Sequence, residues 1–136
     1  FEELIAHKID LTGIILKPHM LLAGNKSKIK ISNKEVSSKT LECLKKSVPN
    51  EVPGIAFLSG GQSELEATEN LDLINKNNDT NFIMTYSYGR ALQQSALKFW
   101  SKNIKDIKGT KNIFNHRERM KTLAAQGKWS SELENK

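Results

Sequence analysis

The chain has 136 residues, 38% of them hydrophobic, which is enough for one domain with a core of its own. Its 21 basic and 15 acidic residues give a net charge of +6, but the lysines are spread over the whole chain, as on solvated surfaces. The densest basic stretch, residues 26–30, has no aromatic side chain for stacking on bases, so we expect no nucleic-acid partner. No secretory leader and no long apolar stretch are visible, which predicts a soluble, cytoplasmic protein without a membrane partner.

Metal and disulfide chemistry are not indicated by the sequence. The single cysteine, Cys43, lies in a helical pattern, where we expect a core or half-buried thiol. The histidines His7, His19 and His116 are scattered, and no group of Cys and His residues has the spacing of a metal site. We therefore expect neither a metal ion nor a cofactor.

Strand and helix signals alternate along the chain, which predicts an α/β fold with parallel strands. Residues 4–7 resemble the end of a helix. Residues 13–16 form a short apolar β run that ends at Lys17 and Pro18, since proline cannot donate to a ladder. Ser32 and Glu35 then form a capping box that opens a helix to about residue 47.

Two more strand–helix units follow. We expect a strand over residues 55–58, after which Ser63 and Glu66 form a second capping box at the start of a helix. The third strand is expected over residues 82–86, and Gly89 opens a third helix.

The last part of the chain is predicted as a linker, a helix and a tail. A polar linker is expected to about Asn112, and Gly127 suits the position just after the end of a final helix. Trp100 is expected in the core, and Trp129 is expected to dock a polar, loose tail over residues 128–136. We accordingly divide the chain into strand–helix units over residues 1–112 and a terminal helix with its tail over residues 113–136.

The residues with useful chemistry all fall at the carboxyl ends of the predicted strands, where a (β/α)8 barrel builds its active site. Strands that are apolar on both faces belong to covered sheets or to closed barrels. A complete barrel needs roughly 200 residues or more. The chain therefore predicts part of such a barrel, about three βα units and a terminal helix.

Lys17 is the candidate nucleophile. A lysine forms a Schiff base only as the neutral amine, which apolar surroundings and a nearby cation favour. The apolar run at residues 14–16 precedes Lys17, and Arg90 is a candidate for the cation. The alternative is a lysine that reaches from the strand end into solvent, and for a lone lysine that alternative is the better one.

Two further motifs are candidate phosphate sites. Ser59, Gly60 and Gly61 form a turn whose backbone N–H groups can approach an anion closely, ahead of a helix. Gly89 offers backbone N–H groups at the next helix start, and Arg90 can bind phosphate oxygens with both arms of its guanidinium. The alternatives are a plain strand-to-helix turn and an exposed first-turn arginine.

No acid–base carboxylate accompanies these motifs. Cleavage of a carbon–carbon bond through an iminium needs a general base. Asp10 precedes the first strand, and Glu64 and Glu66 are expected to cap a helix. The sequence therefore predicts the reactive amine and the phosphate cradle, but not the residues for general acid–base catalysis.

At these motifs the chain closely resembles class I fructose-bisphosphate aldolase. The similar stretches surround Lys17 as GIILKPHM, residues 53–67 as PGIAFLSGGQSELEA, residues 85–100 as TYSYGRALQQSALKFW, and residues 124–128 as AAQGK. The resemblance is collinear and spans nearly the whole chain. It covers only the sixth to eighth βα units of the family's (β/α)8 barrel, which lie in its C-terminal part.

The resemblance implies a role for each motif. Lys17 corresponds to the lysine that forms the Schiff base with the substrate ketone, and Ser59, Gly60, Gly61, Gly89 and Arg90 to the cradle of a substrate phosphate. The implied reaction is reversible cleavage of fructose bisphosphate to dihydroxyacetone phosphate and glyceraldehyde 3-phosphate, without a metal. The implied protein is a glycolytic lyase of the cytoplasm, a homotetramer when full length.

The sequence departs from the family at several points. His19 stands where the family usually has Asn, Leu65 replaces a usual Glu, and the C-terminal Tyr common in family tails is not present. The family's acidic catalytic residues and its second phosphate pocket belong to its N-terminal half.

Two readings stay open from the resemblance. One is part of an aldolase that turns over only with the remaining strands. The other is a non-catalytic remnant that binds sugar phosphates or a protein, such as a cytoskeletal or adhesin-tail partner. For the 136 residues alone we expect marginal stability and aggregation, because three strands cut from a barrel leave open edges and an open face.

Overall fold

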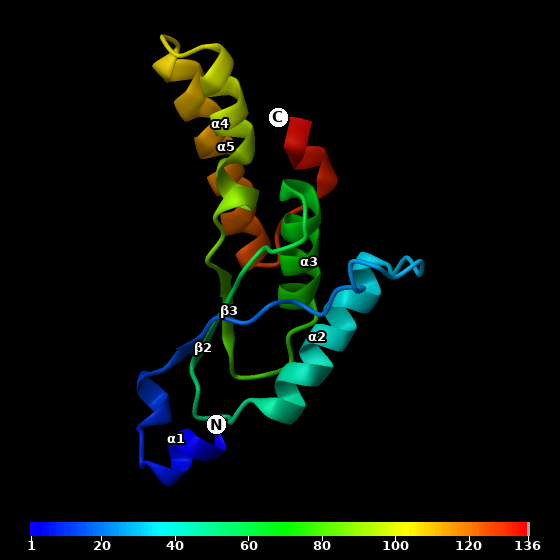
Figure 1. Cartoon of the computed structure of the whole chain (residues 1–136), viewed down its shortest axis with the longest axis vertical. Helices are drawn as coiled ribbons and strands as arrows, with labels where there is room; N and C mark the ends of the chain where they lie inside the picture. The colour runs from blue at the N-terminus through cyan, green and yellow to red at the C-terminus, as the bar shows by residue number, and fades with distance from the viewer. Residues whose placement is uncertain (136) are drawn as a thin grey trace.

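The fold is a three-stranded parallel sheet covered by helices, and the computed structural model describes residues 1–135 (Figure 1). Helices α4 and α5 lie side by side and project beyond the sheet, while α1 lies at the opposite end of the molecule. In chain order the elements are α1 (Glu2–Ala6), a 3-10 turn (Leu11–Gly13), β1 (Ile15–Leu16), α2 (Asn33–Ser47), β2 (Gly54–Phe57), α3 (Glu64–Lys76), β3 (Ile83–Tyr86), α4 (Arg90–Lys102), α5 (Ile107–Ala125) and a second 3-10 turn (Ser131–Asn135).

The sheet has the order β1-β2-β3, which confirms the predicted parallel strands. The paired row of Leu16, Ile55 and Met84 faces the helices, and Ile55 and Met84 are fully buried. The neighbouring row of Ile15, Gly54 and Ile83 faces the other way, and the side chains of Ile15 and Ile83 are 69% and 74% exposed. One face of the sheet is therefore open in this chain, as expected for strands from a barrel whose interior is incomplete.

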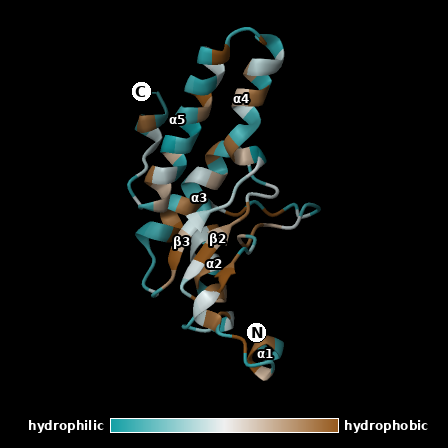
Figure 2. Ribbon diagram, turned by 90° about the vertical axis from the view of Figure 1, so that its left-hand side faces the viewer, coloured by the Kyte–Doolittle hydropathy of each residue, from teal (hydrophilic) through white to brown (hydrophobic). Residues whose placement is uncertain are grey.

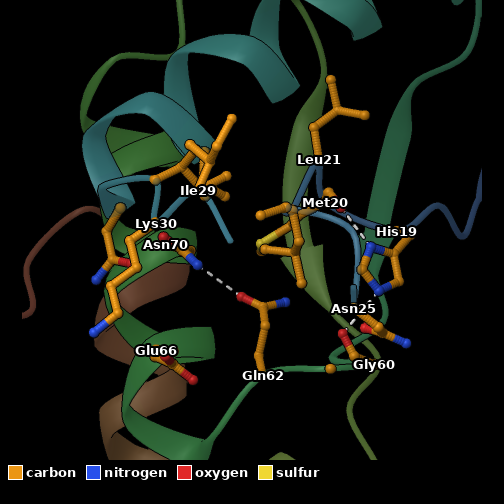
Figure 3. Close-up of a pocket in the computed structure, with 16 residues that line it drawn as sticks. His19, Met20, Leu21, Asn25, Ile29, Lys30, Gly60, Gln62, Glu66 and Asn70 are labelled. Carbon is orange, nitrogen blue, oxygen red and sulfur yellow. Dashed lines mark hydrogen bonds between the residues drawn. The ribbon is translucent and has the colours of Figure 1, made fainter. Parts of the chain in front are cut away.

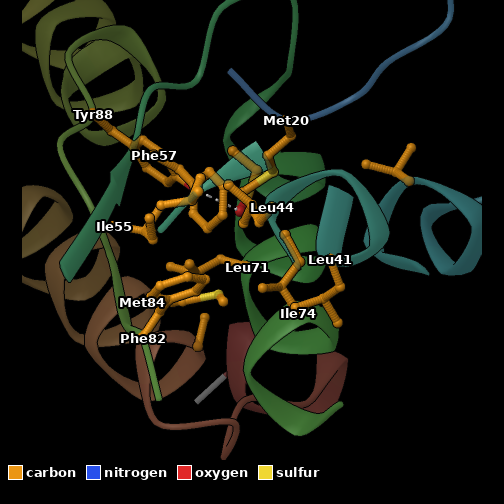
Figure 4. Packing of buried hydrophobic residues seen from close by; sticks show 14 of the residues in the cluster. Met20, Leu41, Leu44, Ile55, Phe57, Leu71, Ile74, Phe82, Met84 and Tyr88 are labelled. Atoms are coloured by element: carbon orange, nitrogen blue, oxygen red, sulfur yellow. Dashed lines mark hydrogen bonds between the residues drawn. The ribbon is translucent and has the colours of Figure 1, made fainter. Parts of the chain in front are cut away.

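The core lies between the sheet and helices α2 and α3 (Figure 4). Apolar residues also follow the strands in Figure 2. Burial of each large apolar side chain contributes roughly 1.5–3 kcal/mol, so this single cluster carries much of the fold. Its central members are Met20, Leu41, Leu44, Ile55, Phe57, Leu71, Ile74, Phe82, Met84 and Tyr88.

Both predicted capping boxes are confirmed. The Ser32 side chain accepts from the Glu35 N–H at 3.2 Å, and the Glu35 carboxylate accepts from the Ser32 N–H at 3.0 Å. The corresponding distances for Ser63 and Glu66 are 3.2 Å and 2.8 Å. These bonds satisfy N–H groups that a helix start otherwise leaves without partners, and they fix where α2 and α3 begin.

The first strand is shorter than predicted. Residues 11–13 form a 3-10 turn, and β1 comprises only Ile15 and Leu16. The cause is Asp10, whose carboxylate accepts from the backbone N–H of Thr12 at 3.0 Å and from its hydroxyl at 2.7 Å. This local bonding competes with an extended conformation.

The predicted linker to Asn112 is wrong, because α5 already begins at Ile107. Asp106 caps this helix by accepting from the Gly109 N–H at 2.8 Å. A Cβ on Gly109 would lie 2.9 Å from the Phe99 ring, so glycine here allows close packing of α5 on α4. The boundary that we placed after residue 112 thus falls inside a helix, and the division into two parts stays a prediction.

The tail up to residue 135 is docked rather than loose. Trp129 is buried, as its predicted docking role requires, and its backbone N–H donates to Asp72 at 2.9 Å. The indole N–H donates to Glu134 at 2.8 Å, and the Arg117 guanidinium also donates to Glu134. The predicted C′ glycine, Gly127, has φ of +64° and is confirmed. Residue 136 lies outside the described residues.

Two predicted burials are also wrong. Trp100 is 45% exposed on α4, and the Cys43 thiol is exposed on α2. Both lie on the sides of their helices that face away from the core. Among residues 1–135 no helix has the length and hydrophobicity to cross a membrane.

Candidate active site at the carboxyl ends of the strands

The backbone brings the three predicted motifs to one edge of the sheet. Beyond the strands proper, the Leu58 N–H donates to the Pro18 carbonyl at 3.1 Å, and the Ser87 N–H donates to the Phe57 carbonyl at 2.8 Å. These bonds extend the parallel ladder past the ends of β1, β2 and β3. The segments that carry Lys17, Ser59–Gly61 and Gly89–Arg90 therefore leave the sheet side by side.

Lys17 follows β1 directly and is exposed. The register pairs Leu16 with Ile55, so the next row contains Lys17, Ala56 and Thr85, on the same open face as Ile15. Within residues 1–135, no carboxylate forms an ion pair with Lys17. The amine thus has no fixed charge partner in this part of the chain, and Lys17 lies on the open face of the sheet.

The turn over Ser59, Gly60 and Gly61 leads from β2 into α3. Gly61 has φ of +72°, a conformation that glycine adopts without steric cost, and the Gln62 N–H donates to the Ser59 carbonyl at 3.2 Å. In the described part of the chain the N–H groups of Gly60 and Gly61 have no hydrogen-bond acceptor. Two adjacent N–H donors without partners on a glycine turn are available to bind an anion.

Helix α4 begins at the third motif and is capped differently from α2, α3 and α5. Its N-cap is Gly89, which offers no side chain to the first N–H groups, whereas side chains of Ser32, Ser63 and Asp106 cap the other three helices. The donors of this first turn are left for an external acceptor. Arg90 is exposed beside them and adds a positive charge.

The two tyrosines before this helix, Tyr86 and Tyr88, pack against each other. Their rings lie 5.3 Å apart between centroids. The buried Tyr88 hydroxyl donates to the Ala67 carbonyl at 3.0 Å, and burial raises the pKa of this phenol. Tyr88 therefore fixes the start of α4 against α3.

A lysine that sequence reasoning missed lies beneath Tyr88. Lys121 on α5 is fully buried, its ammonium donates to the Glu64 carbonyl and to the Thr68 hydroxyl, and it lies 5.7 Å from the centroid of the Tyr88 ring. Burial, with the nearby Arg117 guanidinium, lowers the pKa of Lys121 to about 7. A signal existed, because Lys121 shares a helical face with Arg117 and the buried Ala124.

Glu64 was predicted to cap α3, and this prediction is wrong. Its carboxylate accepts from the Ser95 N–H at 2.9 Å and from the Ser95 hydroxyl, which ties the first turn of α3 to α4. Glu66 and Asp10 are also held by local partners, Ser63 and Thr12. These three carboxylates are therefore all hydrogen-bonded to other groups of the chain.

The described residues give no sign of a metal centre. Among residues 1–135 no three side chains of His, Cys, Asp or Glu gather where they could hold an ion. The groups that this edge presents are the Lys17 amine, free backbone N–H donors and the Arg90 guanidinium.

Comparison with known proteins identifies the fold to which this edge belongs. A family model of glycolytic class I fructose-bisphosphate aldolase matches residues 1–136. The chain belongs to the class I fructose-bisphosphate aldolase family. A non-muscle aldolase of Lethenteron camtschaticum is 45% identical over 95% of this chain, and an aldolase of Dictyostelium discoideum is 36% identical over 97%.

A solved aldolase structure shows the same fold. The aldolase of Plasmodium falciparum, crystallised with TRAP and a small-molecule inhibitor, matches 90% of this chain with a TM-score of 0.86 and 37% identity. The match covers 35% of that chain, and the chain spans about 36% of the length of the Lethenteron relative. The α/β fold is therefore part of an aldolase TIM barrel, as the sequence predicted.

Proposed function

We propose that this chain provides the Schiff-base lysine and the phosphate cradle of a fructose-bisphosphate aldolase, whose other strands lie outside the 136 residues. The observation that carries the proposal is the extended ladder, which brings Lys17, Ser59–Gly61 and Gly89–Arg90 to one edge of the sheet. The family membership supports it. The whole protein is then a glycolytic lyase, and we infer a cytoplasmic homotetramer.

The chemistry begins at the Lys17 amine. The neutral nitrogen attacks the ketone carbon of the sugar phosphate, and loss of water leaves an iminium. The iminium accepts the electron pair of the breaking carbon–carbon bond, while a base takes the proton of the neighbouring hydroxyl. Because Asp10, Glu64 and Glu66 are hydrogen-bonded to other groups of the chain, we expect the base to come from the remaining strands.

The phosphate cradle positions the ketone for this attack. The free N–H groups of Gly60 and Gly61 and the uncapped start of α4 approach from neighbouring strands, and Arg90 supplies the charge. Holding the phosphate at two points fixes the rest of the molecule, which is how binding distant from the reacting atoms accelerates a reaction. The 136 residues alone are expected to bind a triose phosphate without cleaving a hexose.

The test is reductive trapping of the protein as its gene encodes it. With dihydroxyacetone phosphate and borohydride we expect one covalent adduct, located at Lys17 by peptide mass mapping. Lys17→Arg should abolish the adduct, while Lys34→Arg, which changes an exposed lysine on α2, should leave it unchanged. No adduct in the wild-type protein, or an adduct only at another lysine such as Lys121, rejects the proposal.

A second candidate is a protein-binding role without chemistry. It is favoured by the similar Plasmodium falciparum aldolase, whose structure contains TRAP. A partner of that kind, such as an adhesin tail, would bind regardless of whether Lys17 can form an imine. Retained partner binding together with absent trapping would support this candidate over the enzyme.

A further inference from the structure

The carboxylate of Glu64 joins the two helices that follow the candidate phosphate motifs. Glu64 is the first residue of α3, and its carboxylate accepts from the Ser95 N–H at 2.9 Å and from the Ser95 hydroxyl. Ser95 lies in the second turn of α4, and the contact spans 31 residues of sequence. One side chain therefore links the two strand–helix units that carry the two halves of the proposed cradle.

A third helix, α5, holds the same residue. The backbone carbonyl of Glu64 accepts from the buried Lys121 ammonium, which also donates to the Thr68 hydroxyl. Burial lowers the pKa values of Lys121 and Arg117, and the negative charge of Glu64 opposes that shift in both. The half-buried Glu64 thus lies where α3, α4 and α5 meet, with its backbone fixed by one helix and its carboxylate by another.

The turn over Ser59–Gly61 is attached to α3. Gln62, the residue after the turn, accepts from the Asn70 side chain of α3 at 2.7 Å (Figure 3). On the other side of the turn, the His19 Nε2 atom lies 2.7 Å from the carbonyl oxygen of Gly60. Together with the capping box of α3, these contacts make the position of the turn depend on the position of α3.

The start of α4 depends on contacts with α3. Among residues 1–135, the side-chain hydrogen bonds between α3 and α4 are those of Glu64 with Ser95. Just before α4, the Tyr88 hydroxyl donates to the Ala67 carbonyl of α3 at 3.0 Å. A hydrogen bond keeps its strength over a range of only about 0.5 Å, so donors on two helices bind one phosphate together only if their separation is fixed. These contacts with α3 fix that separation.

We propose that Glu64 is a positioning residue for phosphate binding, which fixes the start of α4 relative to the Ser59–Gly61 turn through its two bonds to Ser95. The inference rests on the proposed function, since it concerns the same cradle. Glu64 acts on the grip of the phosphate and leaves the reactivity of the Lys17 amine unchanged. Its loss therefore affects a phosphorylated ketone and spares the same ketone without phosphate.

The test is reductive trapping of the gene product at increasing concentrations of dihydroxyacetone phosphate. For Glu64→Ala we expect the concentration for half-maximal trapping at Lys17 to rise about tenfold, the loss typical of one charge-assisted bond. The trapping rate at saturation should stay within about twofold of the wild type, because the amine is unchanged. Glu64→Gln keeps an oxygen acceptor for the Ser95 N–H and should restore the half-maximal concentration to within about threefold of the wild type.

Dihydroxyacetone, the same ketone without phosphate, separates positioning from a general loss of structure. Glu64→Ala should trap it at the same concentrations as the wild type, whereas a distorted site would trap both compounds less well. The matched control is Glu69→Ala, which removes another half-buried glutamate of α3 and should follow the wild type with both compounds. If Glu64→Ala does not fold, Ser95→Ala removes the hydroxyl bond alone and should raise the half-maximal concentration of dihydroxyacetone phosphate about threefold.

The two proposals fail differently. If the wild type forms the Lys17 adduct but the Glu64 and Ser95 variants need no more dihydroxyacetone phosphate than the wild type, the inference on Glu64 is wrong and the proposed function stands. The inference is equally wrong if Glu64→Ala weakens trapping of both compounds alike, or if Glu64→Gln restores nothing. If the wild type forms no adduct with dihydroxyacetone phosphate, both proposals are wrong.

Discussion

Replacing the buried Lys121 by methionine should change how stability depends on pH. The pKa of Lys121 falls from 10.5 to about 7 on folding, because burial disfavours the ammonium. Between these values the unfolded chain binds more protons than the folded chain, so the free energy of unfolding rises with pH. Each pKa unit corresponds to about 1.4 kcal/mol, and half of the folded molecules are already neutral at pH 7.

Integrated over this range, the wild type should gain about 2 kcal/mol of stability between pH 7 and pH 9 from this one side chain. Methionine fills a similar volume and cannot titrate, so Lys121→Met should lose that gain. The free energy of unfolding of the variant, measured relative to that of the wild type, should therefore fall by about 2 kcal/mol between pH 7 and pH 9.

The assay is urea denaturation of the gene product at pH 7, 8 and 9, followed by circular dichroism. Lys111→Met, which changes an exposed lysine on the same helix, is the matched control and should keep the wild-type pH dependence. Parallel pH profiles for Lys121→Met and the wild type would refute the reasoning. Lys121 would then be charged and fully compensated in the folded protein.

Two further outcomes follow from the fold. Ser63→Ala removes the capping box of α3 and should cost about 1 kcal/mol in urea denaturation, while Ser38→Ala on an exposed position of α2 should change stability little; equal losses would argue against the cap. Ile83→Lys places a charge on the open sheet face and should make the isolated 136 residues more soluble in sedimentation assays, yet destabilise a gene product in which further strands cover that face. An isolated chain that aggregates as before would contradict the first part.

The features that the sequence predicted well are those fixed by near neighbours. The two capping boxes depend on residues three positions apart, and Gly127 ends α5 because its own φ is positive. The parallel strands were recognised from their apolar runs and their spacing. In each case the physical cause lies within a few residues of the element, so the element can be predicted from the sequence without knowledge of the fold.

The features that were missed depend on contacts between distant elements. Lys121 is buried because Thr68 and Glu64 of α3 accept from its ammonium, and no local pattern contains those partners. The docked tail depends on Asp72 and on Arg117, which lie on two other helices. His19 had no visible partner in the sequence, since Gly60 is 41 residues away.

The candidate site was also predicted only in part. Its residues were chosen from the sequence, and the extended ladder now brings their segments together. Their roles in binding and catalysis stay predictions. The described residues also show why the site needs more chain: Lys17 stands on a face whose isoleucines, Ile15 and Ile83, are mostly exposed to water.

The open face connects stability with reactivity. A surface that covers the side chains of Ile15 and Ile83 would stabilise the protein by roughly 3–6 kcal/mol, at about 1.5–3 kcal/mol for each side chain. The same surface would exclude water from the row that contains Lys17, Ala56 and Thr85. Because a low-dielectric environment favours the neutral form of an amine, the same cover would favour the neutral Lys17 that the proposed Schiff base requires. Under the proposed function, strands that complete the barrel would therefore supply three things together: a cover for the open sheet face, a dry environment for Lys17 and the general base.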